Sequence, residues 1–141
     1  MPLKISKIDP QAKLPEYAHP TDAGLDIFSN EEHTLSPNSR HTFSTGISFA
    51  LPEGTVGLIW DKSGLAAKSG LKTMAGVVDE NYRGELKIVL HNLSSQEFKV
   101  EKYSKIAQML VQRIEHPDIT EVDDLDETDR GAGGFGSTGR V

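Results

Sequence analysis

The sequence predicts an all-β protein, a sandwich or a barrel with one short helix, and three observations support this class. Short segments rich in β-branched and aromatic residues recur at intervals of roughly 8–12 residues, with turn residues between them. Only one stretch has a helical pattern. Hydrophobic residues make up 36% and aromatic residues 6% of the 141 residues, a thin supply that suits a β architecture or a core shared within an oligomer.

Each predicted element follows from a local pattern. Residues 3–8 alternate apolar and polar side chains, as a half-buried strand does. Residues 52–54 combine proline and glycine and predict a turn. The one expected helix covers residues 64–70, with Ser63 as its N-cap and Gly70 as its end. On β propensity, further strands are expected at residues 41–51, 55–60, 84–92, 98–102 and 106–114.

Composition and charge exclude several classes of function. The formal net charge of −6 argues against non-specific nucleic-acid binding, which needs a basic surface. The absence of cysteine rules out disulfides and thiolate metal sites. No run of about 18 apolar residues predicts a membrane span, and the first residues lack the apolar stretch of a signal peptide. We therefore expect a soluble, intracellular and cytoplasmic protein with no membrane partner, the nucleus or an organelle being left open.

Three segments of different composition divide the chain. Residues 1–115 contain all the predicted strands and form the expected β body, which would carry the catalysis. Residues 116–129 form an acidic connector that self-repulsion would keep extended. Residues 130–141 contain five glycines, two hydroxyls, two arginines and one aromatic ring. A flexible linker is the ordinary interpretation of such a tail, but its donors also suit phosphate and its ring suits a base.

Four other polar clusters lie at predicted strand ends. Residues 22–27 place two carboxylates around a turn of small residues, and residues 61–66 combine a lysine and a hydroxyl with a helix start, which attracts anions. Residues 76–85 carry an aspartate and a tyrosine in the turn of an expected β-hairpin. Residues 105–110 hold a glutamine in an apolar strand, and a buried amide needs partners. Each cluster by itself has an adequate structural explanation.

Taken in order, these segments and the tail resemble the five motifs of the trimeric deoxyuridine triphosphatase (dUTPase) family. The match runs from about residue 20 to residue 139 and covers nearly the whole chain. The resemblance implies a distorted jelly-roll-like β-barrel or sandwich of the β-clip type, with a flexible C-terminal arm closing over the active site. It also implies a homotrimer with sites between subunits, and Mg²⁺-dependent hydrolysis of dUTP to dUMP and pyrophosphate.

By the same resemblance, the third motif would supply the base and the nucleoside pocket. Asp79 would be the general base that activates the water attacking the α-phosphorus. Tyr82 would lie under the deoxyribose and leave no room for a 2′-hydroxyl. A narrow hairpin would read uracil by backbone groups and exclude the methyl group of thymine. The residues of this hairpin would be Gly76, Val77, Val78 and Lys87.

The other motifs would hold the triphosphate. Phosphate contacts of the second and fourth motifs would come from Lys62, Ser63, Gly64 and Gln108. The closing arm would cover the uracil with its ring and hold the γ-phosphate, through Arg130, Phe135, Gly136, Ser137 and Thr138. Asp26 of the first motif would support Mg²⁺ largely through water, since Mg²⁺ usually keeps waters and binds substrate phosphates directly.

The chain departs from the family pattern at two places. Lys62 stands where arginine is usual and gives a point charge in place of a bidentate fork. Asp61 precedes it and adds a negative charge that needs a cation, such as Lys68. The fourth motif begins with residues 103–105, Tyr-Ser-Lys, in place of Gly-Asp-Arg, which concerns a structural contact more than the chemistry.

Two other functions stay open. A related deoxycytidine triphosphate deaminase would need a catalytic glutamate and would lack the aromatic arm. A non-catalytic nucleotide sensor would have no need of Asp79. The five histidines have no metal-binding spacing and read as surface or structural residues, with His91 a candidate for packing between subunits.

Overall fold

The computed structural model describes all 141 residues and contains eleven strands and one helix. The chain is therefore mostly β, as predicted. The elements in order are β1 (Lys4–Lys7), β2 (Leu25–Phe28), β3 (His33–Leu35), β4 (Arg40–Ser44), β5 (Ile47–Ala50), β6 (Thr55–Trp60), α1 (Ser63–Ser69), β7 (Leu71–Met74), β8 (Val77–Val78), β9 (Lys87–Asn92), β10 (Phe98–Val100) and β11 (Lys105–Arg113).

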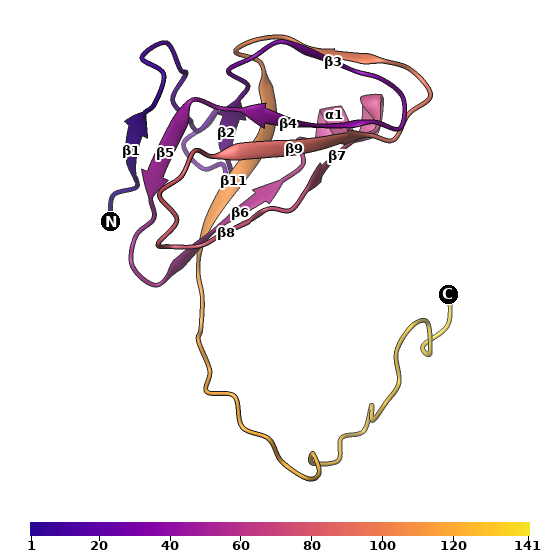
Figure 1. Cartoon of the computed structure of the whole chain (residues 1–141). Coiled ribbons are helices and arrows are strands. Elements are labelled where there is room, and N and C mark those ends of the chain that lie inside the picture. Colours follow the sequence, from indigo (N-terminus) through magenta and orange to yellow (C-terminus); the bar gives the residue numbers. More distant parts are fainter.

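The strands form two main sheets that pack as layers (Figure 1). One sheet has the order β2-β11-β6-β8 and the other the order β4-β9-β7. Two smaller pairs, β1-β5 and β10-β3, extend them. Every ladder is antiparallel, and no sheet closes into a barrel. The result is a distorted jelly-roll-like β-sandwich, and the predicted fold class is confirmed.

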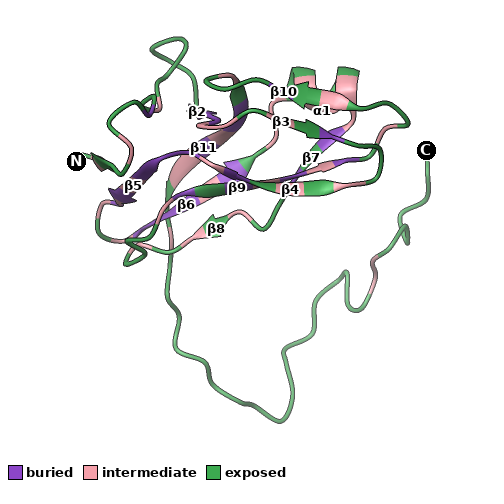
Figure 2. Ribbon diagram, turned by 45° about the horizontal axis from the view of Figure 1, so that its top comes forward, coloured by how far each residue is buried: buried purple, intermediate pink, exposed green.

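A single apolar core lies between the layers. Seventeen buried hydrophobic residues form it, and strand alternation supplies them. In β9, for example, Ile88 and Leu90 are buried while their neighbours are more exposed. Phe43 of β4 is fully buried beside them. Figure 2 shows that the buried residues lie on the strands, whereas the loops and the C-terminal segment are mainly exposed.

A glycine divides the strand expected at residues 41–51 into β4 and β5. Gly46 has a φ of +70°, in the left-handed region that side chains disfavour. A Cβ at Gly46 would also lie 2.9 Å from the Cβ of Ala12. The sequence pattern is continuous across this position, so the prediction of one strand was wrong. The chain turns there from the three-stranded sheet to the β1-β5 pair.

The hairpin predicted at residues 76–85, with its return strand through Lys87, is also wrong as a hydrogen-bonded unit. β8 pairs with β6, whereas β9 pairs with β4 and β7. The two strands thus belong to different sheets. The space between them is a pocket, because no ladder closes it.

The helix ends as predicted but begins differently. Gly70 adopts the left-handed conformation with a φ of 67°, and its N–H donates to the carbonyls of Ala66 and Leu65. The N-cap position belongs to Lys62 rather than Ser63, and no side chain caps the first turn. Lys62 therefore lies in an extended conformation immediately before the helix.

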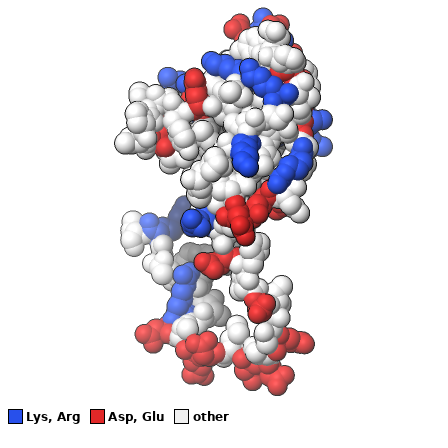
Figure 3. All heavy atoms as spheres, turned by 90° about the vertical axis from the view of Figure 1, so that its left-hand side faces the viewer, with Lys and Arg blue, Asp and Glu red and all other residues white.

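Beyond β11 the chain leaves the body. Residues 115–129 contain no helix or strand, and all are exposed. Figure 1 shows this segment curving away from the sheets, with the C-terminus far from β11. In Figure 3 the acidic side chains gather at its lower bend. No helix in the structure has the length and apolar character that crossing a membrane requires.

Candidate functional site

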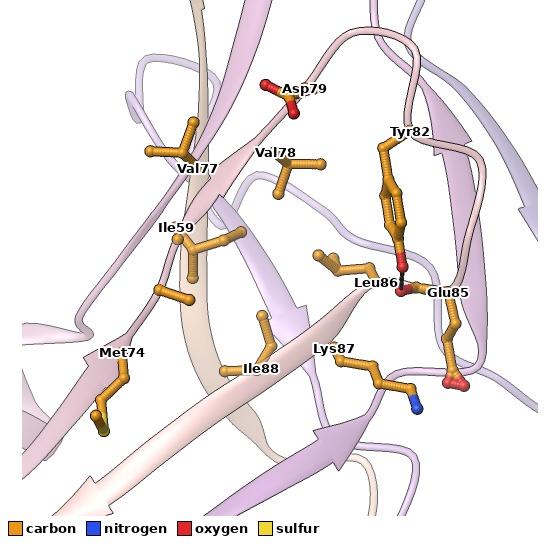
Figure 4. Close-up of a pocket in the computed structure, with 12 residues that line it drawn as sticks. Ile59, Met74, Val77, Val78, Asp79, Tyr82, Glu85, Leu86, Lys87 and Ile88 are labelled. Carbon is orange, nitrogen blue, oxygen red and sulfur yellow. Dashed lines mark hydrogen bonds between the residues drawn. The ribbon is translucent and has the colours of Figure 1, made fainter.

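A mostly apolar pocket of about 220 Å³ opens between β8 and β9 (Figure 4). Six of the predicted site residues line it: Gly76, Val77, Val78, Asp79, Tyr82 and Lys87. The remaining lining residues are Ile59, Met74, Ala75, Glu85, Leu86 and Ile88, which the sequence did not single out. Burial alternation could have identified Leu86 and Ile88 as inward-facing, but it does not distinguish a pocket wall from the core.

The turn after β8 fixes Asp79 and Tyr82 at the pocket rim. The carbonyl of Asp79 accepts a hydrogen bond from the N–H of Tyr82 at 3.1 Å. The hydroxyl of Tyr82 donates to the carbonyl of Glu85 at 2.8 Å, the contact drawn in Figure 4. This hydrogen bond holds the phenol ring of Tyr82 against the turn that leads to Glu85. Asp79 is exposed, so its carboxylate is open to water and to a ligand.

A close backbone approach between β8 and β6 shapes the floor of the pocket. The N–H of Ile59 donates to the carbonyl of Gly76 at 2.8 Å. Gly76 has a φ of +118°, and a Cβ there would lie 3.0 Å from the carbonyl oxygen of Ile59. Only glycine satisfies both conditions. The backbone geometry alone therefore requires glycine at position 76 of the third motif, whether or not Gly76 also contacts a ligand.

Two glutamates tie the same turn to neighbouring elements. Glu80 accepts a hydrogen bond from the N–H of Gly54 at 2.8 Å, and Glu85 accepts one from the hydroxyl of Ser44 at 2.9 Å. These bonds tie the pocket rim to the loop before β6 and to β4. The rim is consequently held at two points by elements distant in sequence.

A second polar cluster lies at the Trp60 end of β6. Asp26 of β2 is 2% exposed, and its two carboxylate oxygens each contact a lysine. The Nζ of Lys62 lies 2.5 Å from Oδ1, and the Nζ of Lys105 lies 2.7 Å from Oδ2. Burial raises the pKa of Asp26, but the close contacts of Lys105 and Lys62 outweigh it and leave the pKa below the ordinary value.

Gln108 of β11 completes this cluster. It faces Asp26 on one side and Trp60 on the other in the sheet register. Its amide donates to the carbonyl of Asp61 at 2.8 Å. A Cβ at Gly24 would lie 2.3 Å from the Gln108 amide oxygen, so the glycine of the first motif makes room for this side chain. The first, second and fourth motifs therefore meet at one place.

Asp61 is neutralised by Lys72 and not by Lys68. Its carboxylate lies 2.8 Å from the Nζ of Lys72 and accepts hydrogen bonds from the N–H and hydroxyl of Thr73 at 2.7 and 2.8 Å. Burial acts to raise the pKa of Asp61, and these contacts lower it below the ordinary value. The unusual aspartate is thus a structural link between the end of β6 and β7.

The pocket and the second cluster lie at different ends of β6. The register of β8 continues to place Asp79 beside Val56, while Gln108 lies opposite Trp60. At roughly 3.3 Å per residue, about 13 Å of strand separates the two positions. Within one chain, Asp79 is therefore not brought together with Lys62, Ser63, Gly64 or Gln108.

The C-terminal segment contacts neither group of residues. Arg130 donates to the carbonyl of Gly133 at 2.7 Å, and the ring of Phe135 is fully exposed. Figure 1 shows this end of the chain away from β8 and β9. The structure therefore does not bring the predicted arm residues, namely Arg130, Phe135, Gly136, Ser137 and Thr138, to the pocket of their own chain.

The residues present do not form a protein-ligated metal site. No group of three or more histidine and carboxylate side chains is placed to hold an ion. Asp26 has both oxygens against ammonium groups, which compete with a cation for the same lone pairs. An Mg²⁺ ion held by Asp26 does not fit this arrangement, so no catalytic step is derived through a metal.

Known proteins similar to this chain agree on one family. The family model for dUTPase matches residues 10–139. The chain is 48% identical over 140 residues to a deoxyuridine 5′-triphosphate nucleotidohydrolase of Rhodococcus erythropolis, covering 97% of this chain and 85% of the relative. It is 46% identical over 143 residues to the enzyme of the same name from Clostridium kluyveri, with both chains covered in full.

Solved structures give the same result. A mutant dUTPase of Staphylococcus bacteriophage 80alpha with dUpNHpp has a TM-score of 0.92 at 29% identity, with 99% of each chain covered. A mutant dUTPase from phage phi11 of S. aureus, whose structure contains a structural Mg(II) ion, has a TM-score of 0.84 at 26% identity, covering 90% of this chain and all of that chain. With the family model matched along almost its whole length, the chain belongs to the dUTPase family.

Proposed function

We propose that this protein is a dUTP diphosphatase, which converts dUTP and water to dUMP and pyrophosphate. The observation that carries the proposal is the pairing of Asp79 and Tyr82 at the rim of an apolar pocket, in a chain of the dUTPase family. A relative bound to dUpNHpp supports a deoxyuridine nucleotide as the ligand class.

The pocket suits a uracil nucleoside. Its wall is apolar, with Val78, Leu86 and Ile88 among the lining residues, and such surfaces bind flat rings. The polar atoms of uracil would be read by backbone groups of residues 76–78 and of Lys87. Tyr82 would lie against the deoxyribose, where its ring excludes a ribose 2′-hydroxyl. A thymine methyl group would have to enter the narrow space between the two sheets.

Asp79 would act as the general base. Its carboxylate takes a proton from a water molecule as the water oxygen forms a bond to the α-phosphorus. The bond from the α-phosphorus to the bridging oxygen breaks, and pyrophosphate leaves with that oxygen. An exposed carboxylate at the pocket rim is available for this task because it has no competing ion pair among the salt bridges of the structure.

We propose Mg²⁺ as the ion that accompanies the triphosphate. The family resemblance implies it, and the phi11 relative contains a structural Mg(II) ion. Mg²⁺ commonly binds substrate phosphates and keeps several waters, so it needs no cage of protein ligands.

A complete site would draw on more than one copy of the chain. The separation of Asp79 from Gln108 along β6 supports this, because one triphosphate must be held near both. Val77 is 71% exposed and Trp60 is 53% exposed, leaving apolar surface for a neighbouring copy. We propose a homotrimer in which residues 1–115 form the body, residues 116–129 span between subunits and residues 130–141 close over a neighbour's site.

One assay tests the proposed function. The protein is incubated with dUTP, dCTP, dTTP or UTP and Mg²⁺, and both pyrophosphate and ammonia are measured. Pyrophosphate from dUTP alone is expected. Ammonia from dCTP would instead identify a deaminase, and tight dUTP binding without turnover would identify a nucleotide sensor.

A further inference from the structure

Lys105 lies on the same face of the sheet as Asp26 and Gln108, although its position in the sequence predicts the opposite. Lys105 and Gln108 are three residues apart, and on a regular strand they would point to opposite faces. The register between β11 and β2 shifts between Lys105 and Ala107. Lys105 consequently pairs with Phe28, which shares a face with Asp26.

This irregularity in β11 has a specific local effect. A bulge adds a residue to one strand and re-aims the side chains beyond it, and such bulges are frequent beside functional sites. Here it turns the ammonium group of Lys105 towards the buried carboxylate of Asp26, at 2.7 Å. Without the shift, Lys105 would point to the other face of the sheet.

The shared carboxylate holds two ammonium groups side by side. Lys62 contacts one oxygen of Asp26 and Lys105 contacts the other. One carboxylate cancels one of the two positive charges, so Asp26, Lys62 and Lys105 together retain one positive charge. Asp26 raises the pKa of Lys105, and so do Glu16 and Asp22, which also lie near Lys105 but form no ion pair with it. The lysine side chains are 30% and 42% exposed, which leaves the remaining N–H donors of each ammonium open to a ligand.

We propose that Lys105 is a second phosphate-binding cation of the triphosphate site, and that Asp26 positions Lys62 and Lys105 instead of ligating the metal. The proposal rests on the proposed dUTP hydrolysis, which supplies the triphosphate. It also accounts for the lysine at position 62. Two ammonium groups held by one buried carboxylate can donate to the phosphates from two neighbouring points. A single arginine would instead donate through the two nitrogens of one guanidinium group.

The test compares ligands with and without phosphate. Binding of α,β-imido-dUTP and of deoxyuridine is measured by calorimetry with the full-length protein in EDTA, at several salt concentrations. Lys105→Met should weaken analogue binding about tenfold and reduce its salt dependence, leaving deoxyuridine binding unchanged. Lys105→Arg should retain most of the analogue affinity. Lys99→Met, which removes the exposed partner of Glu32, is the matched control and should bind both ligands as the wild type does.

Unchanged analogue affinity in Lys105→Met would overturn the role of Lys105. An equal loss of deoxyuridine and analogue binding would also overturn it, because that result indicates a general structural defect. Failure of the wild type to release pyrophosphate from dUTP would instead refute the proposed function. The two failures are therefore distinguishable.

The role of Asp26 has its own test. In Asp26→Asn, the affinity for α,β-imido-dUTP should change by the same factor in EDTA and in excess Mg²⁺, since the effect is exerted through the lysines. A change seen only with Mg²⁺ would show that Asp26 acts on the metal and would overturn this part of the proposal.

Discussion

Gly84 and the ring of Tyr82 occupy adjoining space, and a Cβ at Gly84 would lie 2.4 Å from the tyrosine hydroxyl. The same Cβ would lie 2.6 Å from the ring carbon that bears this hydroxyl. The backbone of Gly84 is not in the left-handed region, so its constraint is one of space. Because Gly84 has no side chain, the Tyr82 ring can pack against the turn that carries it. Its hydroxyl then donates a hydrogen bond to the carbonyl of Glu85.

Gly84→Ala should therefore displace the Tyr82 ring. We expect kcat/KM for dUTP to fall by about 10- to 100-fold, because small misplacements at a reacting site have large effects. The ratio of dUTP to UTP hydrolysis should fall as well. Steady-state kinetics with both nucleotides checks this, and an unchanged ratio would mean that the ring position does not govern sugar selection.

Asp79→Asn should abolish most turnover and preserve nucleotide binding. The amide cannot accept the proton of the attacking water, and loss of a general base costs about 10²- to 10⁴-fold. Single-turnover kinetics and calorimetry with α,β-imido-dUTP measure the two effects separately. Glu97→Gln, an exposed carboxylate remote from the pocket, serves as the control. Equal activity of Asp79→Asn and wild type would exclude Asp79 as the base.

Asp61 should contribute a pH-dependent part of the stability. Its pKa is depressed in the folded protein, so its stabilising contacts are fully present above the ordinary pKa of 3.8 and are lost as the pH falls through the lower folded value. Urea denaturation at pH 7 should show Asp61→Asn to be less stable by about 1.5–3 kcal/mol, the range for hydrogen bonds to a charged group. Below pH 3.8 the difference between variant and wild type should shrink. A difference that stays constant down to acid pH would contradict the assignment.

Removal of residues 130–141 should lower turnover strongly and leave the body assembled. The segment contacts no strand, so its loss takes no packing from the core. Light scattering reports the oligomer, and dUTP kinetics report the activity. Full activity in the truncated protein would show that this segment is not a lid.

Much of the fold could be predicted because its causes are local. β6 has the predicted bounds, and the αL residue Gly70 ends α1 where the glycine stands in the sequence. β2 was missed because all four of its residues are buried, including Asp26, so it has no alternation. An aspartate among small and apolar residues indicates a turn. The sequence does not show that Lys62 and Lys105 neutralise Asp26 and so allow it to be buried in a strand.

The site was predicted only in part, for a similar reason. Asp79 and Tyr82 are three residues apart and share one turn, so their proximity follows from the sequence. The pocket itself lies between two sheets, and strand pairing over long separations decides where it opens. The orientation of Lys105 depends on a register shift that strand alternation cannot anticipate.

The length of β6 predicts that two different inactivating substitutions can complement each other. Asp79 and Gln108 lie beside different ends of this strand, so damage to one half of the site leaves the other half of the same chain intact. In the proposed trimer, a subunit with Asp79→Asn still offers its phosphate-binding half to a neighbour. Mixing it with subunits carrying Lys62→Met should restore dUTP hydrolysis in a fraction of sites. The mixture of Asp79→Asn and Lys62→Met subunits would thus hydrolyse dUTP faster than either variant alone.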